Sequence, residues 1–206
     1  MSRTLVMCAA HAGYDSESQP LGGGAAIAER LGRAWAGRAG LLVVGSGPVP
    51  PADLEYCQVD LLDGRHPATL NEWQYARFCR RFERATTDLI LARARRHEVV
   101  VLTHDISEGP DFGALARHGV ACFPILHVDV VEFFCRMYLR GLVPPELAVR
   151  FHRLLRWLPW PDLLRLVFDK QADAVDFCPG LVVPSEGMVR VLRQCYPKLP
   201  GSRLHV

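Results

Sequence analysis

Short apolar runs alternate with helical patterns along nearly the whole chain, and this alternation is the strongest constraint on its fold. The runs are apolar throughout, which is typical of strands buried on both faces of a parallel sheet. Strands are expected at 4–10, 41–44, 55–61, 98–103, 120–126, 181–183 and 203–206, and helices at 25–36, 71–96, 112–117, 130–139, 145–157, 161–176 and 186–195. This order predicts an α/β fold with a doubly wound, Rossmann-like parallel sheet.

Composition places this sheet in one globular domain. Of 206 residues, 50% are hydrophobic and 22% are charged, which suits a packed core and argues against disorder. The formal net charge is only +2, so it implies no general attraction to nucleic acid. No repeat or Gly/Ser-rich linker marks a second domain. We therefore expect one domain over residues 1–206, with a helical insertion at about 130–176.

Cysteine spacing and hydropathy bear on the compartment. The seven cysteines include no C-x-x-C pair, which argues against a zinc site and a disulfide framework. The first apolar run is too short for a signal peptide, and no uninterrupted apolar stretch is long enough to span a bilayer. The sequence is therefore expected to be cytoplasmic and reduced.

A run of three glycines, Gly22, Gly23 and Gly24, precedes the first helix. A glycine loop at a helix start can hold a phosphate, because no side chain blocks the approach and the free backbone N–H groups point outward. The alternative is a tight turn that requires positive φ. Neither a G-x-G-x-x-G motif nor a Walker lysine is present to decide between the two.

Histidines stand at two predicted strand ends: His104, followed by Asp105, and His127. In parallel sheets, ligands bind beyond the carboxyl ends of the strands. A histidine there can orient a hydroxyl, donate to developing charge or bind a metal, and Asp129 could complete a metal set. The alternative is a partly buried histidine that is hydrogen-bonded to backbone.

The segment Phe133–Phe168 interleaves aromatic residues with arginines. Helices with aromatic and arginine faces can lie on anionic membrane surfaces. The alternative is that the aromatic side chains are core and the arginines form a solvated face.

Taken in order, these segments resemble the N-terminal, acceptor-side domain of the retaining GT-B glycosyltransferases of family 4, the glycogen-synthase-like group. That domain has a Gly-Gly pair before its first long helix, a strand ending in a His-Asp-like pair, a strand ending in a histidine, and a strand followed by serine and a helix. The matching segments are Pro20–Leu31, Val99–Asp105, Phe123–His127, Leu181–Glu186 and, before the interdomain linker, Arg203–Val206.

The resemblance implies a transferase that moves a sugar from a nucleotide-sugar donor, its substrate, to a sugar or lipid-linked acceptor, with no metal or cofactor. His127 would be catalytic, contacting the transferred sugar and stabilising the transition state. The resemblance further implies substrate-binding roles for Gly22, Gly23 and Gly24, which would face the donor diphosphate, for His104 and Asp105 on the acceptor side, and for Ser185 and Glu186.

The resemblance also implies a missing partner. In family 4 a C-terminal lobe with an E-x7-E pattern holds most of the donor site, and that lobe is expected to be absent here. The second lobe would be supplied in cis or as a separate chain, and this chain alone would be inactive. Many enzymes of the group that use lipid acceptors dock on a membrane through their N-terminal lobe, so an anionic surface at the inner face of the membrane is a further expected partner. The other hypotheses are a non-catalytic binding module of the same fold and a small metal-dependent hydrolase built on His104, Asp105 and His127.

Overall fold

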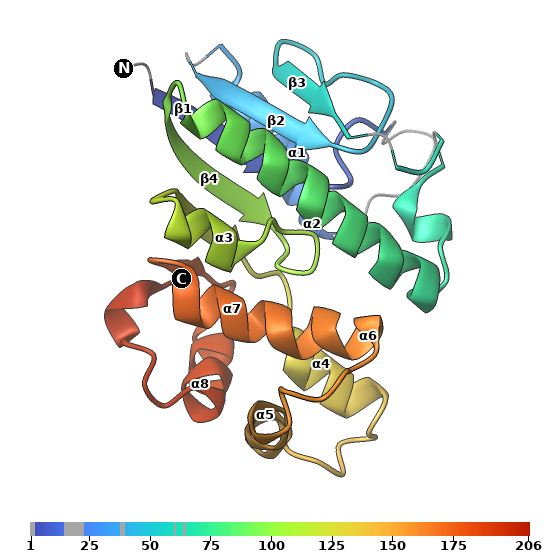
Figure 1. Ribbon diagram of the computed structural model, residues 1–206, viewed down its shortest axis with the longest axis vertical. Helices are drawn as coiled ribbons and strands as arrows, with labels where there is room; N and C mark the ends of the chain where they lie inside the picture. Colours follow the sequence, from blue (N-terminus) through green and yellow to red (C-terminus); the bar gives the residue numbers. More distant parts are fainter. Residues whose placement is uncertain (1–2, 15–22, 38–39, 60, 64) are drawn as a thin grey trace.

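Seven strands form one sheet in which every neighbouring pair runs parallel, and Figure 1 shows the part of it that contains β1 to β4. The computed structural model describes residues 3–14, 23–37, 40–59, 61–63 and 65–206. The strand order is β3-β2-β1-β4-β5-β6-β7. The strands are β1 Arg3–Cys8, β2 Leu41–Gly45, β3 Glu55–Gln58, β4 Glu98–His104, β5 Ala121–Ile125, β6 Leu181–Val182 and β7 Leu204–His205. This arrangement confirms the predicted doubly wound parallel sheet.

The central strands are covered on both faces, which explains why their sequences are apolar throughout. Val6 and Cys8 of β1 pack into the main core with residues of helix α2, Glu72–Ala94. Met7, between them, packs on the opposite face, where the contacts include residues of helix α1, Gly23–Trp35. Successive side chains of a strand point to opposite faces, so two helical layers need apolar residues at every position.

Local sequence explains where several helices begin. Asn71 accepts a hydrogen bond from the Gln74 backbone while the Gln74 side chain accepts one from the Asn71 backbone, a capping box at the start of α2. Asp111 is the N-cap of α3, Phe112–Arg117, where its side chain accepts a hydrogen bond from the Ala114 backbone. Such caps satisfy backbone N–H groups that have no partner within the helix.

The segment between β5 and β6 is helical. It comprises α4 Val130–Met137, α5 Pro145–Leu154, α6 Asp162–Leu164, a π-helical turn at Arg165–Asp169, and α7 Lys170–Phe177. The helix predicted at 161–176 is therefore present, but a π-helical turn interrupts it. The spacing of the apolar residues does not predict this turn. Helix α8, Glu186–Cys195, follows β6, and short 3-10 turns occupy Pro67–Thr69 and Gly201–Arg203. In the described part of the chain, no helix is long and apolar enough to cross a membrane.

The parallel register brings the carboxyl ends of the strands to one edge. Cys8 of β1 lies beside Thr103 of β4, and His104 of β4 lies beside Ile125 of β5. The loops that follow these strands start at the same edge, as the sequence predicted. This edge carries the polar side chains described next.

Candidate functional site

Histidines follow three neighbouring strands at the carboxyl edge. His11 lies three residues beyond β1, His104 is the last residue of β4, and His127 lies two residues beyond β5. His104 is buried, and the other two are partly buried. The structure therefore brings His104 and His127 together, as predicted, and adds His11 to them.

His11 is paired with a buried carboxylate. Its Nε2 lies 2.8 Å from Oε1 of Glu108, and the Tyr75 hydroxyl donates to the same oxygen over 2.6 Å. Glu108 is only 4% exposed, and a buried carboxylate is stable only when partners of this kind replace water. Burial lowers the pKa of His11, but the Glu108 and Asp105 carboxylates outweigh it, so that the pKa is raised.

The second nitrogen of His11 is buried and has no partner among the described residues. With Nε2–H donated to Glu108, this nitrogen, Nδ1, carries the lone pair. A histidine with one nitrogen held by a carboxylate and the other unpartnered can accept a proton and remain charged beside that carboxylate. The pair therefore has the geometry of a general base.

Aromatic rings also pack beside His11. The His66 ring centroid lies 5.4 Å from that of His11, and the Tyr14 ring packs edge-on against His66 at 4.6 Å. His66 is itself fixed, because its Nδ1 accepts a hydrogen bond from the Ala68 backbone over 3.1 Å. The His11 imidazole is thus positioned by a carboxylate and a packed ring.

His104 and His127 stack on one another. Their ring centroids lie 5.6 Å apart with planes tilted by 16°. Burial, and then the neighbouring His127, lower the pKa of His104 to about 4, so its ring is neutral at pH 7. Within the described chain, neither nitrogen of His104 nor Nε2 of His127 has a hydrogen-bond partner. The backbone hydrogen bonds of a purely structural histidine are therefore missing here.

The glycine run meets His127. A Cβ atom on Gly24 would lie 2.8 Å from Cδ2 of His127 and 3.1 Å from its Nε2. Such a contact is too close, so only glycine allows the first turn of α1 to lie against the imidazole. Gly23 is the first residue of α1, and Gly22 lies outside the described residues. The phosphate-binding role of the run stays a prediction.

The side chains of Asp105 and Asp129, which were predicted to lie at the site, accept hydrogen bonds from nearby backbone groups. Asp105 has a left-handed backbone (φ 66°), and its side chain accepts a hydrogen bond from the Ser107 backbone over 3.0 Å. Burial, then the nearby Glu108 carboxylate, raise its pKa. Asp129 caps α4 through the Glu132 backbone. Among the described residues, no three His, Cys, Asp or Glu side chains are grouped so that they could hold a metal.

Ser185 and Glu186 lie beyond β6. The Ser185 hydroxyl accepts a hydrogen bond from the Met188 backbone over 3.3 Å and so caps α8, whose first residue is Glu186. Both side chains are exposed. The structure thus gives Ser185 a local structural role, and substrate binding by the two residues stays a prediction.

A cavity of about 770 Å³ opens beside His11. His11 and Tyr14 line one side, and α1 contributes Ala28 and Gly32 to another. The remaining wall includes residues 49–54, between β2 and β3. The volume falls in the range of small-molecule sites, and the lining is mainly apolar. His11, whose Nε2 is paired with Glu108, therefore lines a space that can hold an organic molecule.

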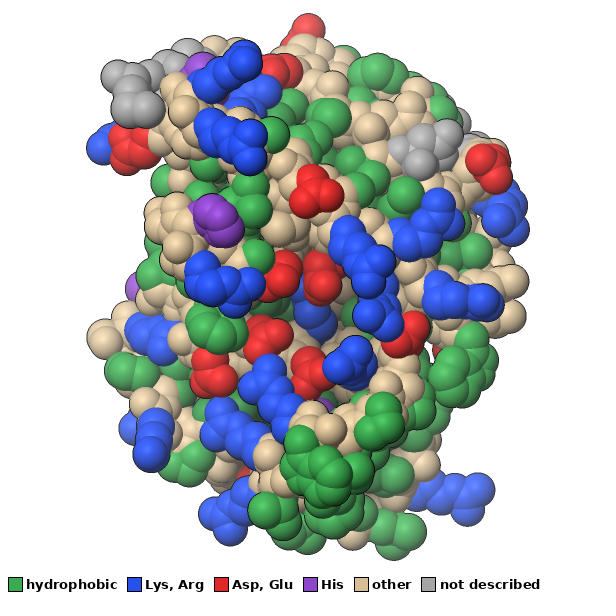
Figure 2. Space-filling model, in the orientation of Figure 1, with side chains coloured by type: hydrophobic (Ala, Val, Ile, Leu, Met, Phe, Trp, Pro, Cys, Tyr) green, Lys and Arg blue, Asp and Glu red, His purple; other side chains and the backbone are tan. Residues whose placement is uncertain are grey.

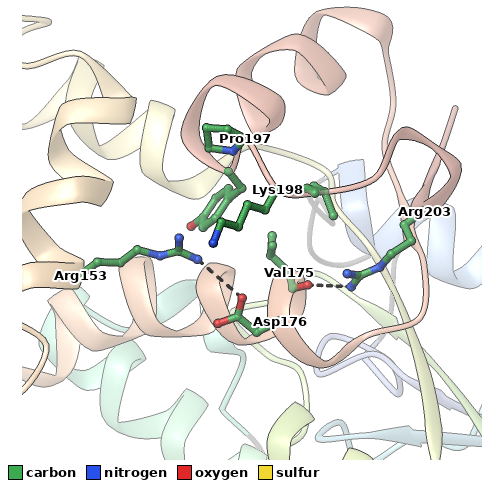
Figure 3. A pocket seen from close by; sticks show the side chains of 8 residues that line it. Arg153, Val175, Asp176, Pro197, Lys198 and Arg203 are labelled. Atoms are coloured by element: carbon green, nitrogen blue, oxygen red, sulfur yellow. Dashed lines mark hydrogen bonds and ion pairs between the residues drawn. The ribbon is translucent and has the colours of Figure 1, made fainter.

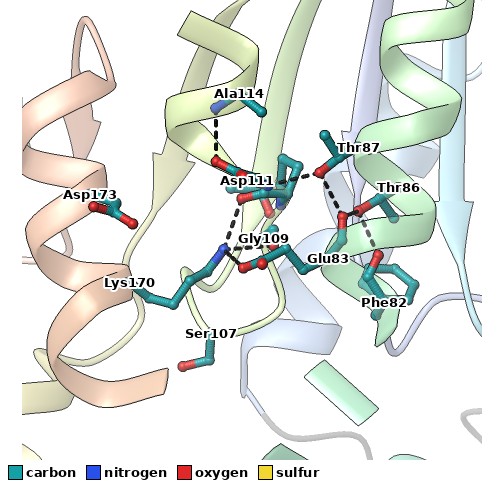
Figure 4. Close-up of polar contacts among 12 residues, drawn as sticks. Phe82, Glu83, Thr86, Thr87, Ser107, Gly109, Asp111, Ala114, Lys170 and Asp173 are labelled. Atoms are coloured by element: carbon teal, nitrogen blue, oxygen red, sulfur yellow. Dashed lines mark hydrogen bonds and ion pairs between the residues drawn. The ribbon is translucent and has the colours of Figure 1, made fainter. Parts of the chain in front are cut away.

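A buried lysine holds the loop that carries Glu108 (Figure 4). Lys170 of α7 donates to the carbonyls of Gly109 and Pro110 over 2.9 and 2.8 Å, and to the Glu83 carboxylate of α2 over 2.7 Å. Its ammonium also lies 4.5 Å from the centre of the Phe112 ring. All three ammonium donors are thus satisfied. Through these hydrogen bonds the lysine links α7 to α2 and to the loop between β4 and α3.

A second cavity, of about 370 Å³, lies between α5, α7 and the chain that follows α8 (Figure 3). Arg153 stacks over the Tyr196 ring at 5.0 Å and lies 3.5 Å from Asp176. Arg203 donates to the carbonyl of Val175 over 2.6 Å. Among the described residues, none lines both this cavity and the cavity beside His11. Both arginines that line this cavity therefore already interact with other groups of the protein.

The similarity of this chain to known proteins lies in its fold. No family model and no curated protein matches its sequence. UGT2 of Phytolacca americana, solved with UDP-2-fluoro-glucose and pterostilbene, matches with a TM-score of 0.59 at 12% identity over 100% of this chain and 54% of its own. The chain has the fold of one half of a GT-B glycosyltransferase.

Two further GT-B structures agree. Os79 of O. sativa, in complex with U2F and trichothecene, matches with a TM-score of 0.52 at 15% identity, over 95% of this chain and 50% of its own. A UDP-glucosyltransferase of Polygonum tinctorium capable of glucosylating indoxyl matches with a TM-score of 0.51 at 12% identity, over 98% and 51%. The chain thus spans about half the length of these structures. These neighbours are UDP-glycosyltransferases, and membership of family 4 stays a prediction.

Within this GT-B half, sequence reasoning overlooked His11 and Glu108. The rule that led to His104 and His127, a polar side chain just beyond a buried strand, also applies to His11 after β1. Glu108 carried no comparable signal, since it lies in a loop with Asp105 and Asp111 and nothing in the spacing distinguishes it. Only the folded loop brings its carboxylate to His11.

Proposed function

We propose that this chain is the acceptor-side half of a glycosyltransferase. It would bind an acceptor in the cavity beside His11 and present it to a nucleotide sugar held by a second lobe, in cis or on another chain. The observation that carries the proposal is the His11–Glu108 pair: Nε2 lies 2.8 Å from Oε1, Nδ1 has no hydrogen-bond partner among the described residues, and His11 lines a 770 Å³ cavity. The GT-B fold supports the same assignment.

In the proposed reaction, His11 removes the proton from an acceptor hydroxyl. The acceptor oxygen forms a bond to the anomeric carbon, the bond from that carbon to the diphosphate breaks, and the nucleotide leaves with the electron pair. The proton ends on Nδ1 of His11, and Glu108 stabilises the resulting imidazolium. His104 and His127, with their unpartnered nitrogens, would orient sugar hydroxyls at the adjoining strand ends.

The stereochemistry distinguishes this course from the one that the family 4 resemblance implies. Direct attack opposite the leaving diphosphate inverts the anomeric centre, whereas the resemblance predicts retention with His127 at the transferred sugar. The product is therefore expected to have the anomeric configuration opposite to that of the donor. Retention would assign the transfer step to the His127 side and leave His11 as an acceptor-binding residue.

The test is an assay with the second lobe present, using a panel of nucleotide sugars and of sugar or lipid-linked acceptors. His11→Ala should lower kcat by about 100- to 10,000-fold, the usual contribution of a general base. His118→Ala, at an exposed histidine, is the matched control. Equal turnover in His11→Ala would contradict the proposed base. Acceptor binding without turnover would instead support the binding module.

The separate 206-residue chain should show no transfer, because GT-B chemistry needs both lobes to position the donor and exclude water. Robust turnover by the chain alone would contradict the proposed division of the site. Cytoplasmic location is proposed with the same reaction, since nucleotide-sugar donors would have to reach the site.

A further inference from the structure

The outer faces of α4 and α5 expose an unusual number of apolar side chains. Of fourteen large hydrophobic residues that are exposed in the described chain, eight lie between positions 133 and 157. Leu142, at the turn between the helices, is 83% exposed, and Trp157, beyond α5, is 79% exposed. We define the α4–α5 surface by these eight residues: Phe133, Met137, Tyr138, Leu142, Leu147, Phe151, Leu154 and Trp157.

The spacing of these residues makes the surface continuous along each helix. On α5, Leu147, Phe151 and Leu154 follow one another at intervals of four and three, which places them on one outward face. The opposite face is already buried through Ala148 and Val149. Helix α5 is therefore apolar on both faces, a pattern that water alone does not favour.

Basic charge surrounds this surface. Five arginines lie at positions 130–160, and three of them form ion pairs: Arg136 with Glu132, Arg153 with Asp176, and Arg156 with Asp169 and Asp173. Arg140 and Arg150 are exposed and form no ion pair within the described chain. Figure 2 shows hydrophobic side chains gathered at the lower end of the molecule, where α4 and α5 lie, with Lys and Arg side chains beside them.

We propose that the α4–α5 surface docks on an anionic lipid bilayer. Apolar side chains would enter the boundary between headgroups and acyl chains, Trp157 would lie at the headgroups, and Arg140 and Arg150 would contact lipid phosphates. The charge selects this occupant. A second copy of the chain, meeting this one around a two-fold axis, would bring the same positive patch against itself. An anionic bilayer complements both the charge and the apolar area.

The position of the surface connects it to the candidate site. Helix α4 begins at Asp129, its N-cap, two residues beyond His127. A bilayer under α4 and α5 would therefore adjoin the carboxyl edge of the sheet. This step rests on the proposed glycosyl transfer. Together, docking and transfer would make the acceptor a lipid-linked compound. Docking itself can be measured without any transfer assay, so failure of one proposal does not imply failure of the other.

Co-sedimentation of the 206-residue chain with phosphatidylcholine vesicles, with and without phosphatidylglycerol, tests the docking. Binding should require phosphatidylglycerol and weaken with added salt. Arg140→Gln/Arg150→Gln should weaken it about 30-fold, or roughly fivefold for each arginine. The control Arg81→Gln/Arg84→Gln, on the exposed side of α2, removes the same charge and should leave binding unchanged.

Leu142→Glu/Trp157→Glu separates insertion from charge. Both side chains are exposed, so the variant should fold, as circular dichroism would check, and its vesicle affinity should fall at least about tenfold. Arg84→Glu changes the charge equally on another helix and should have little effect. Equal binding to neutral and anionic vesicles, or none to either, would overturn the proposal. So would a dimer that Leu142→Glu/Trp157→Glu dissociates while vesicles are ignored.

Discussion

The strand-end edge and the α4–α5 surface depart from ordinary packing in opposite ways. At the edge, ionisable side chains are buried: Glu108 is 4% exposed, His104 is 3% exposed, and several histidine nitrogen atoms have no partner among the residues that the structure describes. At the α4–α5 surface, large apolar side chains stand in water. Burying polar groups and exposing apolar ones both cost free energy, so each region points to a binding partner outside the described chain. The edge suits a polar substrate, and the surface suits lipid.

The comparison predicts that buried charge matters most to stability. Lys170→Met should lower the free energy of unfolding by about 3–5 kcal/mol, because Glu83 and the carbonyls of Gly109 and Pro110 lose their buried partner. Lys198→Met, at the only other lysine, which is exposed, should change it by less than about 0.5 kcal/mol. Urea unfolding of both variants measures the difference, and similar values would remove the buried lysine from the account.

The buried side chain of His104 should make stability depend on pH. The folded-state pKa of His104 is about 4 against an ordinary 6.5, so the unfolded chain binds the proton first. Its contribution is present above pH 6.5 and is lost as the pH falls toward 4, by up to about 3 kcal/mol. His104→Gln should flatten this dependence, while His118→Gln should not. Parallel curves for His104→Gln and the native chain would contradict a neutral, buried His104.

Replacing His127 should affect turnover much more than stability. With the second lobe present, His127→Ala should lower kcat on the order of 100-fold while leaving the melting temperature nearly unchanged, because it removes one hydrogen-bond donor at the site. The His104 ring would keep the backbone in place. Unchanged turnover would return His127 to a structural role against Gly24.

At the opposite region, truncation should have little effect on stability. Leu142→Ala should change the free energy of unfolding by less than about 0.5 kcal/mol, because the side chain is 83% exposed. Leu126→Ala, at a residue 2% exposed, should cost about 2–5 kcal/mol. A large loss in Leu142→Ala would mean that the α4–α5 surface is packed in solution, and the contrast between the two regions would fail.

The two regions also differ in how much the sequence predicts. Strands, helices and the shared carboxyl edge follow from local signals, namely the apolar runs and the helical patterns between them. The histidines His104 and His127 follow from strand ends. The pairing of His11 with Glu108 does not, because it depends on the path of two loops far apart in the sequence. Likewise, composition marked residues 133–168 as unusual, but only the fold determines which aromatic side chains face outward.

The most direct test of the central claim is the titration of His11 by NMR in histidine-labelled protein. In the native chain, His11 should titrate above the ordinary pKa of 6.5, because the Glu108 and Asp105 carboxylates outweigh the effect of burial. Glu108→Gln should lower that pKa, and Glu186→Gln, at an exposed residue, should leave it unchanged. An identical His11 pKa in the native chain and in folded Glu108→Gln would contradict the proposal that Glu108 makes His11 a base.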